Sequence, residues 1–225
     1  ADAWDRDTHA AAIRLLSLAG VGVEPTGDAA PCCGALASHA GLADLAGDLG
    51  RAVASALDDD RPIIVDVAGC GAQLTELDGH IGAAGESVAG RTVDIHTVLA
   101  EHADRLPPLP AGAPRPVVAI HDPCHLRHVQ RRHEAVHEVL GRYVDLVPLD
   151  DEGLCCGAGG AYAALHPDEA AMIAERKVDA VHRSGATLVA SANLGCTVHL
   201  AQAGLTVSHP VRIIDDLLGG ADPAS

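Results

Sequence analysis

Two pairs of adjacent cysteines, each followed by a glycine, carry the strongest chemical signal in this sequence. The pairs stand at 32–33 and 155–156, and single cysteines stand at 70, 124 and 196. The total of seven is odd, which argues against a closed set of disulfides and favours a reduced compartment. Thiolates bind soft metals, so the set indicates zinc or the iron of an iron–sulfur cluster.

The adjacency of the cysteines bears on which metal is bound. Adjacent cysteines chelate one small ion less readily than a C-x-x-C loop, whereas a cluster with several irons accepts neighbouring thiolates on different atoms. Our first interpretation is therefore iron–sulfur, our second is zinc, and the third is plain buried thiols or a vicinal disulfide. Gly34 and Gly157 lack a Cβ, so the backbone beside each pair can approach a bulky ligand.

The stretch HDPCH around Cys124 indicates that the local structure shifts the pKa of this thiol. Asp122 is expected to cap a helix that has Pro123 in its first turn. The helix dipole would then lower the pKa of Cys124. His121, His125 and His128 stand close by as ligands or donors to sulfur, although helix surface is the plainer interpretation.

The predicted helices and strands that position these cysteines occur in the same order in each half of the chain. The first half has helical patterns at 8–20 and 42–57, short strands at 21–23 and 62–67, and a closing segment at 93–102. The second half has strands at 116–124, 143–149 and 187–196, helical patterns at 125–141 and 167–185, and a closing segment at 211–220. This repetition predicts an internal duplication.

The alternation of short apolar strands with helical patterns predicts an α/β fold. We expect two duplicated repeats, each a small parallel sheet flanked by helices, with the cysteine loops at the carboxyl ends of the strands. Loops at that edge of a parallel sheet lie together. The expected metal ligands are therefore a set of four thiols and a set of three. The second-half set is Cys124, Cys155, Cys156 and Cys196, and the first-half set is Cys32, Cys33 and Cys70.

The predicted domain division is a first repeat at 1–105, a proline-rich linker at 106–116 and a second repeat at 117–225. The leading cysteine of the first repeat can be sought by counting back from Cys32 by the spacing that separates Cys124 from Cys155. This count ends at Ala1, so that cysteine is absent from the given sequence and would lie at or just before its start. Because there is no initiator methionine either, we expect the chain to be a segment of a longer protein.

Composition excludes several classes of function. The net charge is −16 and no basic stripe offers contacts to phosphates, which argues against nucleic-acid binding. No stretch has the length and apolarity of a transmembrane segment. No Ser-His-Asp grouping or pair of carboxylates indicates catalysis by this chain alone.

Several stretches together resemble one known family. They are PCCGAL, AGCG, HDPCHLRH, LCCGAGGAY, ERKV, NLGC and HPVRIIDDLL. They resemble the duplicated cysteine-rich CCG domain of the iron–sulfur subunit of glycolate oxidase, of lactate-utilisation proteins and of the cysteine-rich subunit of heterodisulfide reductase. The resemblance to the glycolate oxidase subunit is the strongest, and it covers nearly the whole chain.

The resemblance implies electron transfer. Relatives pass electrons from a flavoprotein that oxidises a 2-hydroxy acid, glycolate or lactate, towards the respiratory chain. The resemblance implies that the four second-half cysteines hold a cluster, expected to be 4Fe-4S, and that the first site can be vacant. His125, Asn193 and Gly157 would lie beside the ligands. The implied partners are a flavoprotein dehydrogenase subunit and a further iron–sulfur domain, in the cytoplasm or on the inner face of its membrane through those partners.

The sequence departs from the family pattern in ways that keep alternatives open. No ferredoxin-like C-x-x-C-x-x-C-x-x-x-C-P motif is present, and Val67 and Asn193 occupy the leading position of the C-x-x-C that ends heterodisulfide-type repeats. One alternative is a zinc-stapled scaffold that docks other subunits without moving electrons. Another is a thiol redox protein similar to heterodisulfide reductase.

Overall fold

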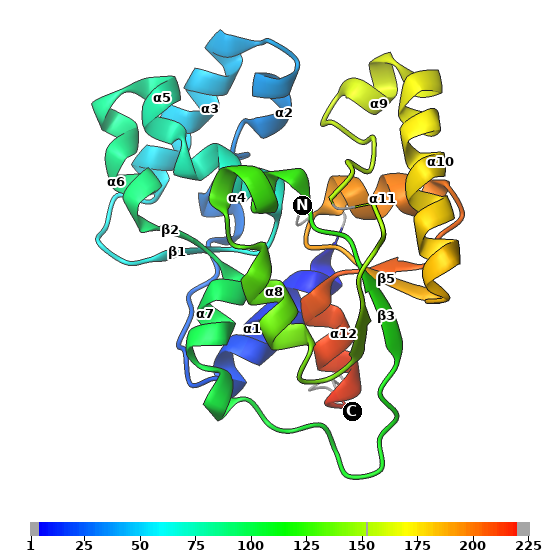
Figure 1. The fold of residues 1–225 in the computed structure, drawn as a ribbon. Coiled ribbons are helices and arrows are strands. Elements are labelled where there is room, and N and C mark those ends of the chain that lie inside the picture. The colour runs from blue at the N-terminus through cyan, green and yellow to red at the C-terminus, as the bar shows by residue number, and fades with distance from the viewer. Residues whose placement is uncertain (1–4, 152, 220–225) are drawn as a thin grey trace.

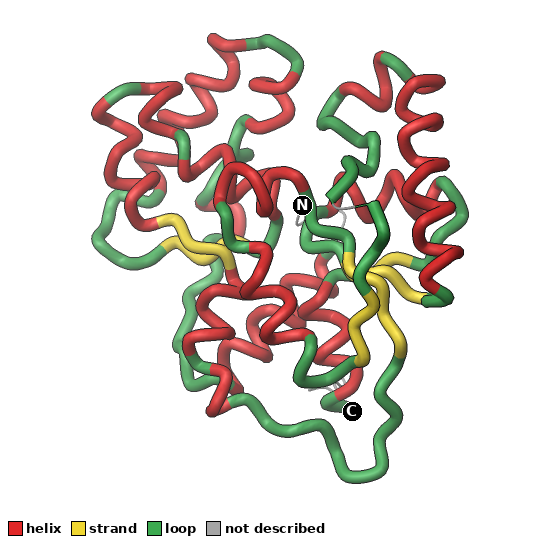
Figure 2. The backbone as a smooth tube through the Cα atoms, in the orientation of Figure 1, coloured by secondary structure: helices red, strands yellow, loops and turns green. Residues whose placement is uncertain are grey.

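The computed structural model describes residues 5–151 and 153–219, and in that part of the chain it shows two parallel β-sheets surrounded by helices (Figure 2). One sheet has two strands in the order β1-β2, and the other has four in the order β4-β3-β5-β6. Every paired strand is parallel to its neighbour. The strands are β1 (Ile63–Val65), β2 (Thr92–Asp94), β3 (Val117–Ile120), β4 (Asp145–Val147), β5 (Leu188–Ala190) and β6 (Val207–Ser208). The predicted fold class is confirmed.

Helices make up most of the remaining structure. The α-helices are α1 (Arg6–Leu18), α2 (Ala35–His39), α3 (Ala43–Ala56), α4 (Ala68–Thr75), α5 (Leu77–Ile81), α6 (Ala83–Arg91), α7 (Ile95–Glu101), α8 (His133–Leu140), α9 (Tyr162–Leu165), α10 (Pro167–Ser184), α11 (Leu194–Gln202) and α12 (Pro210–Leu217). Two 3-10 turns, η1 (Gly27–Ala29) and η2 (Ala103–Arg105), and a π-helix, η3 (His125–Gln130), complete the set. Among the described residues, no helix combines the length and apolarity needed to cross a bilayer.

Helix α10 shows how the local sequence sets an element. Pro167 stands in its first turn, where a missing N–H costs nothing, and Asp168 and Glu169 complement the positive end of the helix dipole. Gly185 ends the helix in the left-handed conformation at φ +74°. The helix begins and ends as the pattern at 167–185 predicts.

One hydrophobic core joins the two halves of the chain. Helix α1 packs against α12, α7 against α8, and α4 against η3, so each contact pairs a first-half helix with a second-half helix. Helices α1, α7, α8 and α12 each place one fully buried side chain in that core. These side chains are Leu15, Leu99, Leu140 and Ile214. In Figure 1 these four helices lie below two helical lobes, α2–α6 on one side and α9–α10 on the other.

The segment 106–116 runs along the outside of this core as a loop without helix or strand (Figure 1). The Tyr143 hydroxyl donates to the Pro107 carbonyl oxygen at 2.7 Å. Arg115 donates to the carbonyl oxygens of Gly141, Arg142 and Val144. The loop is therefore held at both ends, and the division of the chain at this segment stays a prediction.

Two predicted elements are wrong in detail. Residues 21–23 form no strand; Val21 and Val23 pack against the core, but no described strand pairs with them. The helix predicted at 125–141 is broken at Arg131, whose φ of +55° is left-handed, and its first part is the π-helix η3. The wide turn directs Gln130 to the first half, where its side-chain amide donates to the Ala68 carbonyl oxygen at 2.9 Å.

Candidate metal centre

Five of the seven cysteines follow strands, whereas Cys32 and Cys33 follow the 3-10 turn η1, so the strand expected before that pair is wrong. Cys124 follows β3, Cys70 lies in the first turn of α4 after β1, and Cys196 lies in the first turn of α11 after β5. Cys155 and Cys156 lie in the loop that joins β4 to α9. Because the strands of each sheet are parallel, these loops share an edge.

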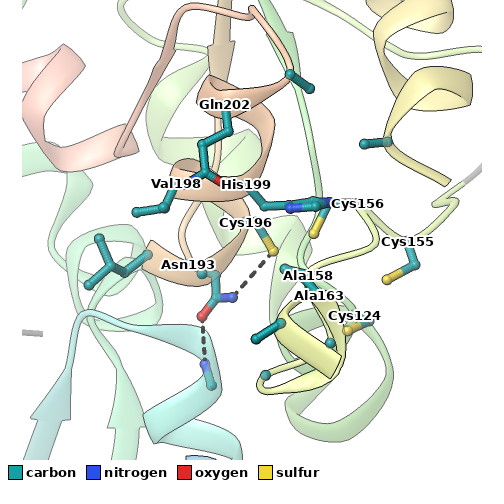
Figure 3. Close-up of a pocket in the computed structure, with 18 of the residues that line it drawn as sticks. Cys124, Cys155, Cys156, Ala158, Ala163, Asn193, Cys196, Val198, His199 and Gln202 are labelled. Carbon is teal, nitrogen blue, oxygen red and sulfur yellow. Dashed lines mark hydrogen bonds between the residues drawn. The ribbon is translucent and has the colours of Figure 1, made fainter. Parts of the chain in front are cut away.

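A cavity of about 1040 Å³ lies between the two halves, and the cysteine loops form part of its wall. Cys124, Cys155, Cys156 and Cys196 line it from the second half, and Cys70 lines it from the first. Figure 3 shows the four second-half side chains around one part of this cavity. Residues distant in sequence therefore meet at one place, as the strand order requires.

The four second-half thiols form a row in which neighbours share protons. The thiols of Cys124 and Cys156 lower the pKa of Cys155 to about 2, and the Cys156 thiol lowers that of Cys196 well below the usual value. In return Cys155 raises the pKa of Cys124, and Cys155 and Cys196 raise that of Cys156. Cysteines with a lowered pKa thus alternate with cysteines with a raised pKa, and a bound cation would favour the thiolate form of all four.

The expectations for Asp122 and Cys124 are corrected here. Asp122 is no helix cap: its carboxylate accepts from the His137 Nε2 at 2.9 Å and lies 3.7 Å from the Arg127 guanidinium. The pKa of Cys124 is raised rather than lowered, because the neighbouring Cys155 thiol and burial outweigh the backbone amide of His125. Contact with a second thiol is a stronger effect than the start of a short helix.

The first-half cysteines form a smaller group. The Cys70 thiol lowers the pKa of Cys33 to about 6, and Cys33 raises the pKa of Cys70. Cys32 is exposed and contributes less to the lowering at Cys33. The structure therefore brings these three residues together beside α4, but with fewer donors than the second half offers.

The glycine after each cysteine pair has a steric role. Gly34 and Gly157 have φ values of +84° and +92°, which favour a residue without a Cβ. A Cβ on Gly157 would lie 2.6 Å from the Ala170 carbonyl oxygen. The Gly157 N–H donates to the Cys155 sulfur at 3.3 Å, so this turn also presents a donor to the candidate ligand.

Asn193 and His125 both contact cysteine sulfurs. The Asn193 side-chain amide donates to the Cys196 sulfur at 3.2 Å, and its oxygen accepts from the Gly69 N–H at 3.0 Å (Figure 3). The His125 Nδ1 lies 3.7 Å from the Cys124 sulfur, and its Nε2 lies 3.1 Å from the Nε2 of His39. Each therefore links the second-half cysteines to the first half.

Two further residues, His121 and Lys177, are buried although the sequence predicts no such burial; from the sequence, His121 is only one of three candidate histidines near Cys124. His121 is 2% exposed, and a ring nitrogen lies within 4.8 Å of the Cys156 and Cys196 sulfurs. Lys177, the single lysine of the chain, is 1% exposed and lies 2.7 Å from the Asp151 carboxylate. The amphipathic pattern at 167–185 gave no signal of this burial.

The donor set fits a soft metal. Sulfurs from four cysteines lie along one wall, no cysteine among the described residues is in a disulfide, and a buried imidazole without an oxygen or nitrogen partner among them adjoins two of the sulfurs. Thiolate and imidazole suit zinc and iron, and four thiolates suit an iron–sulfur cluster. The second-half residues could therefore hold either.

Comparison with known proteins gives a consistent result. The family model for the cysteine-rich domain, CCG, matches residues 2–75 and 118–201. The glycolate oxidase iron-sulfur subunit of Escherichia coli is 32% identical over 227 residues, covering 94% of this chain and 54% of that protein. The probable glycolate oxidase iron-sulfur subunit of Bacillus subtilis is 30% identical over 204 residues, covering 86% of this chain and 45% of that protein.

A relative with another activity is also similar. The fumarate reductase (CoM/CoB) of Methanothermobacter marburgensis has a subunit that is 28% identical over 196 residues, covering 86% of this chain and 38% of that protein. The chain thus spans about half the length, or less, of these three relatives.

Proposed function

The chain belongs to the cysteine-rich CCG-domain family, and on that premise we propose that it is an iron–sulfur electron-transfer subunit or domain of a flavin-linked 2-hydroxy-acid dehydrogenase. The substrate class we infer is glycolate or lactate, because the similar proteins include glycolate oxidase iron-sulfur subunits and lactate utilization protein A. On this proposal a flavoprotein partner oxidises the hydroxy acid, and this chain is not expected to be catalytic alone.

The observation that carries the proposal is the row of four thiols on one cavity wall. Cys124, Cys155, Cys156 and Cys196 come from three strand ends and interact as neighbours. We propose these four as the ligands of a 4Fe-4S cluster, which supplies one-electron storage when it is bound. Cys32, Cys33 and Cys70 form a second, incomplete site that can be vacant.

The protein residues around the four thiols set the environment of such a group. All four thiols line the cavity, but Cys156 and Cys196 are only 2% and 3% exposed and belong to a buried hydrophobic cluster, while Cys124 and Cys155 are half-buried. The Gly157 N–H and the Asn193 amide donate to sulfur and so withdraw negative charge from it. A redox partner would approach from the cavity side, where Leu36 and Val198 are exposed on the wall.

Zinc is the second candidate because one observation favours it. His121, Cys156 and Cys196 place three ligand atoms within 4.8 Å of one another, which supplies three of the four donors that a tetrahedral zinc ion takes. In that case the chain would be a scaffold that docks other subunits and carries no electrons. Turnover of a disulfide substrate with a supplied reductant would instead identify a thiol redox protein.

The test is metal and sulfide analysis of the chain produced and purified without oxygen. We expect a brown, reducible protein with iron and acid-labile sulfide, and we expect Cys124→Ser to lose both. Cys32→Ser separates the two sites, because Cys32 is an exposed thiol of the first-half set: iron that is kept in Cys32→Ser but lost in Cys124→Ser belongs to the four-cysteine row. A colourless parent protein with stoichiometric zinc would contradict the electron-transfer role, and unchanged iron in Cys124→Ser would contradict the ligand assignment.

A further inference from the structure

His121 is a buried imidazole whose two nitrogens have no oxygen or nitrogen partner in the described part of the chain. The residue directly follows β3 and is 2% exposed, and its ring adds to the larger effect of the Cys156 thiol in lowering the pKa of Cys196. Its backbone N–H donates to the Ala190 carbonyl oxygen at 2.9 Å, so the sheet fixes its position. Buried polar groups in native proteins are nearly always satisfied, which calls for a partner outside the polypeptide.

The position of the ring indicates what that partner is. The ligand atoms of His121, Cys156 and Cys196 all lie within 4.8 Å of one another, and all three side chains are buried. They reach this point from three segments, the ends of β3 and β5 and the loop after β4. A metal ion between them would satisfy an imidazole nitrogen and two thiolates at once.

Other histidines near the cysteines have partners of their own. The His199 Nε2 lies 3.3 Å from the Ala170 carbonyl oxygen, and the His125 Nε2 lies 3.1 Å from that of His39. His128, on η3, is exposed. His121 therefore differs from its neighbours in being buried beside two sulfurs without an oxygen or nitrogen partner among the described residues.

We propose that His121 binds the metal of the second cysteine site through a ring nitrogen, next to Cys156 and Cys196. This inference rests on the proposed function for the identity of the metal, but its geometry serves zinc equally. The site would then offer five protein donors, four sulfurs and one nitrogen. A neutral imidazole adds no negative charge, so it favours the reduced state of an iron centre more than a fifth thiolate would.

The experiment is pulsed electron paramagnetic resonance on the reduced, iron-loaded chain. We expect a coupling from a directly bound nitrogen, changed by ¹⁵N-labelled histidine and absent in His121→Ala. It should also be absent in His121→Cys, which keeps a donor and restores metal content if the alanine variant binds poorly. His128→Ala is the control and should retain the coupling. We expect a loss of metal affinity in His121→Ala on the order of tenfold or more.

Each other outcome has a defined meaning. A coupling that persists in His121→Ala, or an iron-loaded parent without a bound nitrogen, would overturn this inference and leave the electron-transfer role standing. If the parent takes zinc instead of iron, the electron-transfer role fails. X-ray absorption at the zinc edge then tests His121: a nitrogen shell that disappears in His121→Ala supports the inference, and an all-sulfur shell in the parent overturns it.

Discussion

Asn193 donates its side-chain amide to the sulfur of Cys196 at 3.2 Å, and its amide oxygen accepts from the backbone of the first half at Gly69. Gly69 directly precedes Cys70 in sequence. One side chain therefore connects the segment that carries a first-half cysteine with a buried cysteine of the second half. It both orients Cys196 and ties α11 to α4.

Replacing Asn193 with alanine removes both hydrogen bonds. We expect a loss of about 1–2 kcal/mol in the free energy of unfolding, at about 1 kcal/mol for each bond. In the iron-loaded protein we also expect a more negative reduction potential, because an N–H donor to sulfur stabilises the reduced state. Denaturant unfolding and a redox titration followed by absorption measure the two effects.

Asn193→Asp separates the two roles of the side chain. Aspartate keeps an acceptor for the Gly69 N–H but offers no donor to Cys196 and adds a negative charge. The potential should fall at least as far as in the alanine variant, while the link between the halves is retained. A potential equal to that of the parent in both variants would show that Asn193 does not influence the metal.

Gly157→Ala should disrupt the second cysteine pair. The residue has a φ of +92°, and its new Cβ would meet the Ala170 carbonyl oxygen at 2.6 Å. Left-handed strain and the backbone clash together predict a loss of about 2–4 kcal/mol of stability, with loss of bound metal. Gly185→Ala is the matched control: its φ is +74° with nothing within 4 Å of the new Cβ, so about 1–2 kcal/mol should be lost and metal content kept.

The sequence predicts the fold class well because its strands and helices differ in length and period. What it could not predict is how the halves pack, since the contact of α1 with α12 joins the two ends of the described chain. The failure at 21–23 has the same origin: Val21 and Val23 look like a strand, but a strand needs a neighbour to pair with. Nor does any local signal mark the left-handed turn at Arg131, which is not a glycine.

The meeting of the four second-half cysteines could be predicted because loops after parallel strands share one edge of a sheet. Their binding of a metal stays a prediction. His121 could be named only as one of three candidate histidines and Lys177 was not assigned a role, because the environment of each depends on burial and on a partner on a distant segment. The same reason explains the wrong prediction for Asp122. Its carboxylate accepts a hydrogen bond from His137 on α8, whereas the local pattern predicted that it caps a helix.

Lys177→Met should destabilise the loop that carries Cys155 and Cys156. The lysine is 1% exposed on α10 and lies 2.7 Å from Asp151, just ahead of the cysteine pair. Removing one partner of a buried ion pair leaves the other charge uncompensated, which predicts a loss of about 3–5 kcal/mol. Thermal or denaturant unfolding measures the change, and metal content reports on the loop.

The same loop and helix supply the control for that substitution. Arg183 on α10 pairs with Asp150 at 2.7 Å, but both side chains are more than half exposed. Arg183→Met should therefore change stability little, because water screens an exposed pair. Equal losses of unfolding free energy in Arg183→Met and Lys177→Met would show that burial does not increase the contribution of the Lys177–Asp151 pair to stability.

His209 makes the stability of the chain depend on pH. It is 4% exposed at the start of α12, where its Nε2 donates to the Asp66 carbonyl oxygen and its Nδ1 accepts from the Val211 N–H. Both bonds need the neutral ring. Burial first, and then the neighbouring His96, lower its pKa from 6.5 to about 4, while Asp66 and Asp94 oppose the shift.

Between pH 7 and pH 5 the unfolded chain therefore binds a proton at His209 that the folded chain does not bind. Stability is fully present above the unfolded pKa and is lost as the pH falls, by about 2 kcal/mol at pH 5 for this one group. His209→Asn keeps a side chain that can cap α12, so it should cost about 1 kcal/mol at pH 7 yet flatten the pH dependence. Urea unfolding of both proteins at pH 7 and pH 5, under reducing conditions, gives the two slopes. Parallel slopes would mean that His209 is not the group that titrates.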